Sequence, residues 1–115
     1  MRIYISCDGE LIEKEILMKE WREVLVEIDS RYYLLDFITI DRLHQEYINA
    51  KENNEAYVVD TTTIIVDEVS KKNVIDTLLK KDRAAFNGIN PIDLSETYKS
   101  SFQELSYIEN WVRIY

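Results

Sequence analysis

One cysteine and one histidine are the first residues to consider for chemistry, because a thiol nucleophile needs a base beside it. The chain contains only Cys7 and His44 of these types, and nothing in their spacing brings them together. We therefore expect Cys7 to be a small buried side chain and His44 to be an imidazole on a helix surface. The same counts exclude an internal disulfide and a Cys/His zinc site within one chain.

The glycines exclude three further functional motifs. Gly9 and Gly88 are the only glycines and each stands alone, so neither a G-x-G-x-x-G loop nor a P-loop can form. Neither glycine belongs to the G-x-S-x-G pattern of a nucleophile elbow. We therefore expect no catalytic residue, no bound metal and no cofactor, and we interpret the chain as a protein that is not an enzyme.

Carboxylates are abundant, at 22 Asp and Glu residues, so a paired acid and base for hydrolysis is an alternative. Asp36 is the carboxylate that lies inside a strongly apolar strand, between Leu35 and Phe37. Alternation along a strand places Asp36 on the opposite face from these two neighbours. It is therefore either a solvent-facing strand residue or a carboxylate of a binding interface.

The acids are concentrated near the N-terminus. From Asp8 to Asp29 there are eight acids against three bases, a balance of −5, and Trp21 lies among them. An aromatic ring among carboxylates suits a surface that meets a basic partner, with the ring as anchor and the acids for steering. The alternative is an amphipathic element whose Trp21 points into the core. Tyr32 and Tyr33 follow, and adjacent strand residues face opposite sides of a sheet.

Length and composition describe an ordinary globular chain of 115 residues, with 46% hydrophobic and 31% charged residues. This length predicts one domain over residues 1–115 with a buried core. No apolar run is long enough for a membrane span, and the N-terminus lacks signal-peptide features, so we expect a cytoplasmic protein. The net charge of −8 disfavours nucleic acid and anionic membranes and favours basic partners. Solubility alone is the alternative explanation of the charge.

Strands and helices are predicted without regular alternation, which is typical of an α+β fold with a mainly antiparallel sheet. Residues 10–28 fit one long helix, or a helix near 10–20 followed by a strand near 22–28, which is the arrangement that we favour. The other strands are expected at residues 2–6, at 32–38 as the returning strand of a hairpin, at 56–66 as one strand or two, and at 111–115 as an edge strand.

About three to four helices are expected to pack on this sheet. Beyond the helix near residue 10, one begins at Thr39 or Asp41 and another at Ser70, because short side-chain oxygens satisfy the free N–H groups there. A further helix over 94–105 follows a capping box in which Asp93 is paired with an acid three residues later. The residues expected on the apolar faces of the middle two helices are Ile40, Leu43, Tyr47 and Ile48, then Val74, Ile75, Leu78 and Leu79.

From Tyr32 to Lys81 the chain runs as a strand, a polar amphipathic helix, a Thr/Val/Ile-rich strand and a second helix, within a single acidic domain. In these general features it resembles the small immunity proteins of bacterial polymorphic toxin and contact-dependent growth inhibition systems. The resemblance implies a stoichiometric inhibitor that binds a secreted toxin, often a basic nuclease, and blocks its active site or substrate path. A phage-type acidic inhibitor of a host defence nuclease and a small hydrolytic enzyme are the alternatives.

The partner is expected to dock on the N-terminal half of the chain, where exposed carboxylates would meet Lys or Arg side chains. Residues 61–115 hold eight acids against seven bases and are expected to face away. The residues predicted to bind the partner are Glu10, Glu13, Glu20, Trp21, Glu23, Glu27, Asp29, Tyr32, Tyr33 and Asp36.

Overall fold

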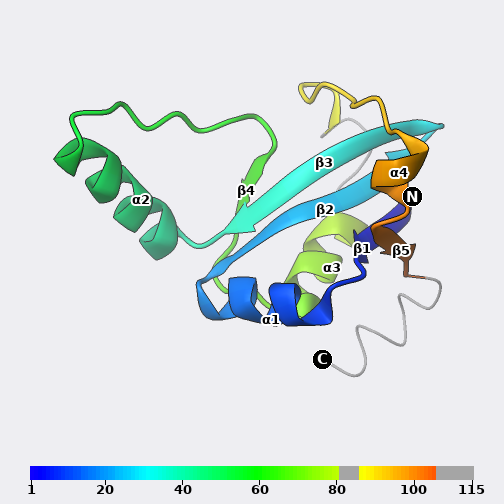
Figure 1. Ribbon diagram of the computed structural model, residues 1–115, viewed down its shortest axis with the longest axis horizontal. Helices are drawn as coiled ribbons and strands as arrows, with labels where there is room; N and C mark the ends of the chain where they lie inside the picture. The colour runs from blue at the N-terminus through cyan, green and yellow to red at the C-terminus, as the bar shows by residue number, and fades with distance from the viewer. Residues whose placement is uncertain (81–85, 106–115) are drawn as a thin grey trace.

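A five-stranded sheet organises the chain, and the computed structural model describes residues 1–80 and 86–105 (Figure 1). The strands lie in the order β4-β3-β2-β1-β5, and all neighbouring pairs are antiparallel except the parallel pair of β3 and β4. With four helices in the described residues, the predicted α+β fold is confirmed. The elements are β1 (Arg2–Ser6), α1 (Gly9–Leu17), β2 (Glu20–Ile28), β3 (Arg31–Ile38), α2 (Ile40–Glu52), β4 (Thr63–Ile65), α3 (Lys71–Lys80), α4 (Glu96–Lys99) and β5 (Phe102–Glu104).

The segment with two possible interpretations, 10–28, is a helix followed by a strand. Asp8 caps α1 by accepting a hydrogen bond of 3.1 Å from a backbone N–H of the first turn. The helix ends where Lys19 takes a positive φ of 62°, a conformation that commonly stops a helix. At the far end of β2, Asp29 and Ser30 have φ values of 51° and 64° and form the two-residue turn into β3.

The main core lies between one face of the sheet and the helices α1 and α3, which are drawn below the sheet in Figure 1. Leu35 and Phe37 are fully buried in it, whereas Asp36 between them faces the opposite side, as alternation predicted. Removing these apolar surfaces from water is the main stabilising contribution to the fold. The fully buried side chains of this core are Ile3, Ile5, Trp21, Val24, Val26, Leu35, Phe37, Val74, Ile75 and Leu78.

The helix α3 follows its predicted cap. The Oγ of Ser70 accepts a hydrogen bond from the backbone N–H of Asn73 at 3.1 Å. Three of its four predicted apolar residues pack into the core, but Leu79 is 50% exposed. Leu79 lies one residue beyond the last inward position, so it points about 100° away from it around the helix.

The opposite face of the sheet carries a second, smaller apolar cluster. The segment that follows Pro91 lies over this face and ends in α4 (Figure 1). Tyr4 and Tyr32 come together there with ring centroids 6.3 Å apart. The members of this cluster are Tyr4, Leu25 and Phe102, with the partly buried Tyr32, Leu34, Ile92, Leu94 and Tyr98 around them.

The predicted helix over 94–105 is wrong, and so is its capping box at Asp93. The helix α4 spans four residues, and it is capped by Ser95, whose Oγ accepts a 3.1 Å hydrogen bond from a backbone N–H. The hydroxyls of Ser100 and Ser101 then donate to backbone carbonyls three residues earlier, a pattern that competes with helix continuation. The chain instead pairs with the free edge of β1 as β5.

Helix α2 stands away from the rest of the molecule, at the left of Figure 1. Thr39 caps it, as predicted, and Asn54 follows its end with a φ of 56°. Its apolar residues do not enter the core, because no residue of α2 is buried. The stripe expected on this helix, Ile40, Leu43, Tyr47 and Ile48, is therefore exposed or only partly covered.

The strand predicted over 56–66, as one strand or as two broken near Asp60, forms only in its second part. Only Thr63–Ile65 joins the sheet, as β4, where it pairs with Asp36–Ile38 of β3. Residues 53–62 return from α2 without forming a strand, because β propensity yields a strand only where a partner lies alongside. The edge strand predicted over 111–115 lies outside the described residues.

Candidate protein-binding surface

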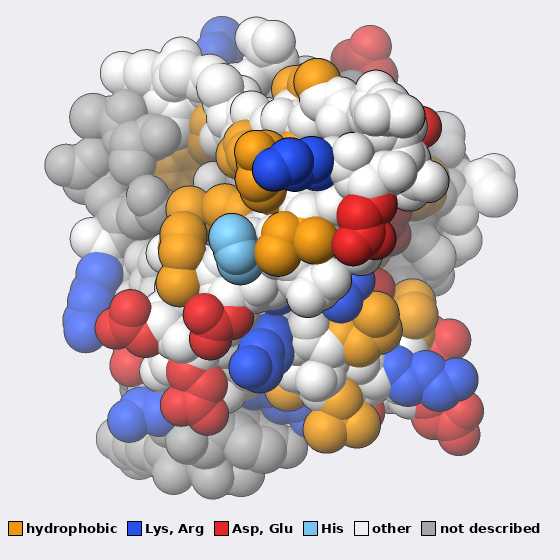
Figure 2. Space-filling view, turned by 90° about the vertical axis from the view of Figure 1, so that its left-hand side faces the viewer, with side chains coloured by type: hydrophobic (Ala, Val, Ile, Leu, Met, Phe, Trp, Pro, Cys, Tyr) orange, Lys and Arg blue, Asp and Glu red, His pale blue; other side chains and the backbone are white. Residues whose placement is uncertain are grey.

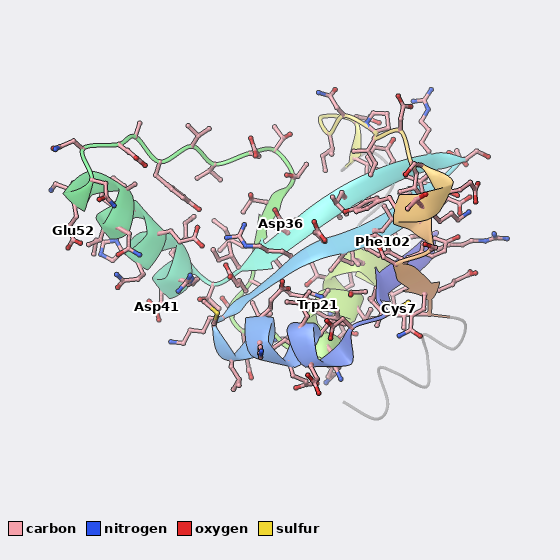
Figure 3. The ribbon with its side chains drawn as sticks, viewed as in Figure 1. Cys7, Trp21, Asp36, Asp41, Glu52 and Phe102 are labelled. Atoms are coloured by element: carbon pink, nitrogen blue, oxygen red, sulfur yellow. The ribbon has the colours of Figure 1, made fainter. Side chains whose placement is uncertain are left out.

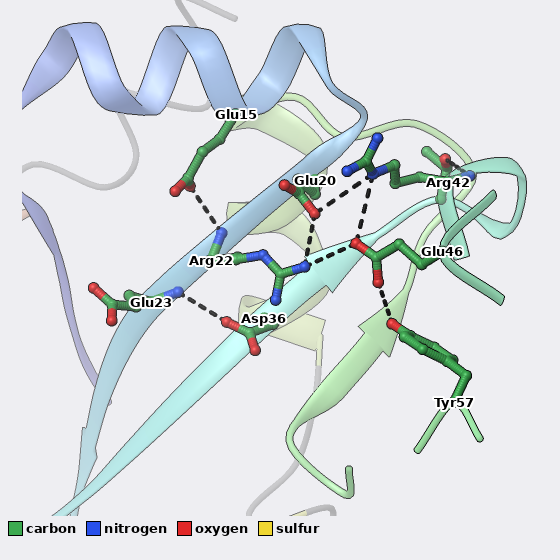
Figure 4. A network of polar contacts seen from close by, with 9 residues as sticks. Glu15, Glu20, Arg22, Glu23, Asp36, Arg42, Glu46 and Tyr57 are labelled. Atoms are coloured by element: carbon green, nitrogen blue, oxygen red, sulfur yellow. Dashed lines mark hydrogen bonds and ion pairs between the residues drawn. The ribbon is translucent and has the colours of Figure 1, made fainter. Parts of the chain in front are cut away.

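The strand β2 contains a bulge in which Arg22 and Glu23 together oppose Asp36 of β3. Glu23 takes a left-handed φ of 61° there. The backbone N–H of Arg22 donates to the carboxylate of Glu15 at 2.9 Å, and that of Glu23 donates to Asp36 at 3.0 Å (Figure 4). Two acids therefore satisfy the backbone donors of the bulge, which gives Asp36 a structural role.

Beside the bulge, a network of ion pairs joins α2 to the sheet (Figure 4). The guanidinium of Arg22 lies 3.0 Å from Glu20 and 2.8 Å from Glu46 of α2. Arg42, also on α2, approaches the same two acids at 3.8 and 3.5 Å. The hydroxyl of Tyr57 donates a hydrogen bond to Glu46. Glu20, which was predicted to bind the partner, is instead buried and forms ion pairs with Arg22 and Arg42 of the same chain.

The network shifts the pKa values of Glu46 and Tyr57. Burial opposes ionisation of Glu46, but the hydrogen bond from Tyr57 and the charges of the two arginines lower the pKa of that carboxyl below its ordinary value of 4.5. Burial and the hydrogen bond to Glu46 raise the pKa of Tyr57 to about 12. At neutral pH Glu46 is therefore a carboxylate and Tyr57 is a neutral proton donor.

Two aromatic residues of the predicted interface belong to the core. Trp21 is fully buried beneath the sheet (Figure 3), so the core alternative for this residue is confirmed. Tyr33 is buried on the same face, with its ring centroid 5.4 Å from that of Phe86. Neither ring is accessible to a partner, and the prediction that they form part of an interface is wrong for this structure.

The other predicted residues are spread over α1 and both ends of the hairpin rather than gathered in one patch. Glu13 lies 2.9 Å from the Nζ of Lys71, and Glu27 accepts a hydrogen bond from the hydroxyl of Tyr4 at 2.8 Å. Tyr32 is half-buried in the second cluster. Their contact with a partner stays a prediction. The members of the predicted set that are exposed are Glu10, Glu13, Glu23 and Asp29.

Exposed apolar side chains gather instead on residues 40–62, which comprise α2 and the chain that returns from it, and which we name the α2 arm. Four of them are strongly exposed: Ile40 at 61%, Tyr47 at 49%, Val58 at 77% and Val59 at 51%. Figure 2 looks onto this end of the molecule and shows hydrophobic side chains on both sides of the histidine, with acidic side chains nearby. Exposed apolar side chains that lie among charged ones make this end of the molecule the candidate interaction surface.

A groove of about 360 Å³ lies beside the arm, where the end of α1, the start of α2 and the segment before α3 meet. Leu17, which is 84% exposed, contributes an apolar wall. Asp41, Asp67 and Glu68 also line the groove, together with one base, Lys19. The carboxylates of this groove have no ion-pair partner in the described part of the chain. The groove therefore combines an apolar wall with net negative charge.

The structure does not bring Cys7 and His44 together. Cys7 follows β1 at the end of the molecule opposite α2 (Figure 3), and its thiol is exposed rather than buried as we expected. His44 lies on the surface of α2, as predicted, with its ring stacked on Tyr47 at 6.4 Å. Among the described residues, no group of three or more His, Cys, Asp or Glu side chains is arranged to hold a metal ion.

Sequence reasoning missed the α2 arm for an identifiable reason. The periodic apolar residues of α2 look like a core-facing stripe, and the two valines at 58 and 59 look like part of a strand. The signal that could have separated the arm from the core is its charge, since five acids and two bases are interleaved with those apolar residues over 40–62.

Within residues 1–80 and 86–105, none of the helices has the length and apolar character needed to cross a membrane. The comparisons of the whole chain with protein-family models, with curated proteins and with solved structures give no match.

Proposed function

We propose that this protein is an immunity protein, which binds a basic toxin domain in the cytoplasm, in particular a nuclease, and neutralises it as a stoichiometric complex. The observation that carries the proposal is a surplus of exposed carboxylates that have no ion-pair partner in the described part of the chain. The cations that do form ion pairs there, such as Arg22 and Arg42, are already used internally. The surplus carboxylates include Asp41, Glu52, Glu55, Asp60, Asp67 and Glu68.

The physical basis is competition for cations. A nuclease holds the phosphate backbone of its substrate with Lys and Arg side chains, and these contacts supply most of the sequence-independent affinity. An acidic protein that presents carboxylates to the same side chains excludes nucleic acid and is steered towards them by long-range attraction. This mode of action needs no turnover by the inhibitor, so the protein is proposed to act by binding alone.

Coexpression with the protein encoded by the gene immediately upstream, which the proposed function predicts to carry a toxin domain, tests this function. We expect the toxin domain alone to stop growth, and the pair to restore growth and to copurify at equal stoichiometry. A Cys7→Ser variant should protect as well as the wild type, because this thiol takes no part in the proposed binding. Continued toxicity with separate elution of the two proteins, or loss of protection in a folded Cys7→Ser variant, would reject the proposal.

A further inference from the structure

We propose that the partner docks on the α2 arm and the groove beside it, and that the docking segment of the partner combines apolar side chains with Lys or Arg. This inference rests on the proposed function and adds the location and chemistry of the interface. It places the interface away from the predicted surface around Glu10, Glu13 and Asp29.

The first argument is the way in which α2 is attached. Its inner face is polar, and Arg42 and Glu46 fix it to Arg22 and Glu20 of β2 by the ion-pair network. Its apolar residues therefore point elsewhere, and not one residue of this 13-residue helix is buried. An amphipathic helix usually buries its apolar stripe, since most helix stability in proteins comes from that packing. The exposed part of this stripe, Ile40 and Tyr47, is a surface that a partner can cover.

The second argument is the charge around the apolar side chains. The α2 arm carries five acids and two bases, and Glu46 and Arg42 are among those engaged in the network. The acids left at its surface, Asp41, Glu52, Glu55 and Asp60, are exposed, and Lys51 is the remaining base. Such a surface attracts a positively charged partner and repels an acidic one, including a second copy of this chain, whose net charge is also −8.

The third argument is that the groove, like the α2 arm, combines exposed apolar side chains with carboxylates. Leu17 and Ile40 are both strongly exposed at the ends of α1 and α2, where the groove lies. The carboxylates of Asp41, Asp67 and Glu68 line it. A cationic side chain of the partner can lay its apolar stem along Leu17 and place its charge among these carboxylates, which is how Lys and Arg side chains bind at mixed surfaces.

The location of the interface is tested by measuring how tightly two variants of this protein, one on the arm and one control, bind the toxin domain. The arm variant, Tyr47→Ala with Val58→Ser, removes two exposed side chains, so it should fold like the wild type. We expect it to bind roughly 30-fold or more weakly, as truncation of interface anchors does. The control, Leu79→Ala, removes a side chain of similar exposure from α3 and should change the affinity by less than about 3-fold. An arm variant that binds as tightly as the wild type would overturn the location and leave the proposed function intact.

A second measurement does not depend on the toxin. We expect a synthetic amphipathic helix of Lys and Leu, titrated into the full-length wild-type protein, to shift the backbone amide signals of residues 40–62, 17–19 and 67–68. The same peptide with Gln in place of Lys should cause no such shifts. Shifts confined to Glu10 and the hairpin turn at Asp29, or no shifts at all, would overturn the inference. The peptide could shift the arm signals while the coexpression experiment yields no toxin complex. That result would reject the proposed function and support the docking surface.

Sedimentation velocity tests whether self-association explains the exposed stripe. We expect the wild type and the arm variant to sediment as monomers at the same rate. A wild-type dimer that dissociates in the arm variant would overturn the inference, because a second copy of the chain would then cover the stripe.

Discussion

Asp36 and Glu15 accept hydrogen bonds from the two backbone N–H groups at the bulge in β2. A bulge interrupts the strand ladder locally, and its donors need other acceptors when they are partly covered. At the scale of single residues, these carboxylates therefore act as substitutes for a strand partner. Alternation along β3 was enough to predict which way Asp36 points, but its acceptor role depends on a bulge that the residue pattern does not reveal.

Replacement of Asp36 by Ala tests this structural role. We expect the free energy of unfolding to fall by about 1 kcal/mol, because the N–H of Glu23 loses the charged acceptor that holds the bulge. Urea denaturation measures the change. Glu10→Ala is the matched control, since this exposed acid should change the stability by less than about 0.5 kcal/mol. Equal stability losses in the two variants would contradict the role assigned to Asp36.

The lowered pKa of Glu46 gives a pH dependence with a defined sign. A carboxyl whose pKa is lower in the folded state contributes stability above its unfolded pKa, near 4.5, and loses it as the pH falls through the folded value. Glu46→Gln should therefore be less stable than the wild type by about 1 kcal/mol at neutral pH, a modest value because Arg22 is half-exposed.

Thermal unfolding from about pH 6 to about pH 3 measures this difference, which should shrink as Glu46 becomes protonated. A difference that stays constant or grows towards acid pH would show that the ion pairs of Glu46 do not stabilise α2.

At the scale of elements, α2 illustrates what local sequence can and cannot predict. Its start at Thr39, one of the two caps predicted, follows from a residue that caps the helix through its own side chain, so local sequence was sufficient to narrow the start to two positions. What covers a helix is decided by distant residues. The charged inner face of α2 meets Arg22, a residue that lies in another element. The same limitation made the C-terminal helix prediction fail, because the free edge of β1 is a nonlocal feature.

Hydrogen exchange tests the attachment of α2. Because no residue of α2 is buried, opening this helix exposes little apolar surface, and its opening free energy should lie at the low end for the molecule. We expect its amides to exchange at least about 10-fold faster than those of α3, where Val74, Ile75 and Leu78 are fully buried. Equal protection of the two helices would contradict a polar attachment.

At the scale of the whole molecule, composition predicted the fold class and the charge but not the topology. The α+β class followed from the irregular order of strands and helices. The strand order and the parallel pairing of β4 with β3 depend on contacts between distant segments, which periodicity does not specify. The position of the acidic surface was also beyond the sequence. It depends on which carboxylates, such as Glu20, are used inside the protein.

The net charge predicts fast association that depends on salt. Steered complexes reach association rate constants of about 10⁸ M⁻¹s⁻¹ at low ionic strength, against roughly 10⁵–10⁶ M⁻¹s⁻¹ without steering. We expect the rate constant for the toxin domain, measured by stopped flow, to fall steeply between about 20 and about 300 mM salt, as the Debye length shortens. A rate constant that hardly changes would mean that the charge of −8 serves solubility alone.

Titration of the toxin domain's nuclease activity with the purified protein tests the central claim most directly. If the protein neutralises a basic toxin by occupying its nucleic-acid groove, activity should fall in proportion to added protein and vanish near one equivalent at concentrations above Kd. The inhibition should weaken as the nucleic-acid substrate is raised, because both compete for the same cations. Undiminished nuclease activity in the presence of several equivalents of folded protein would contradict the account.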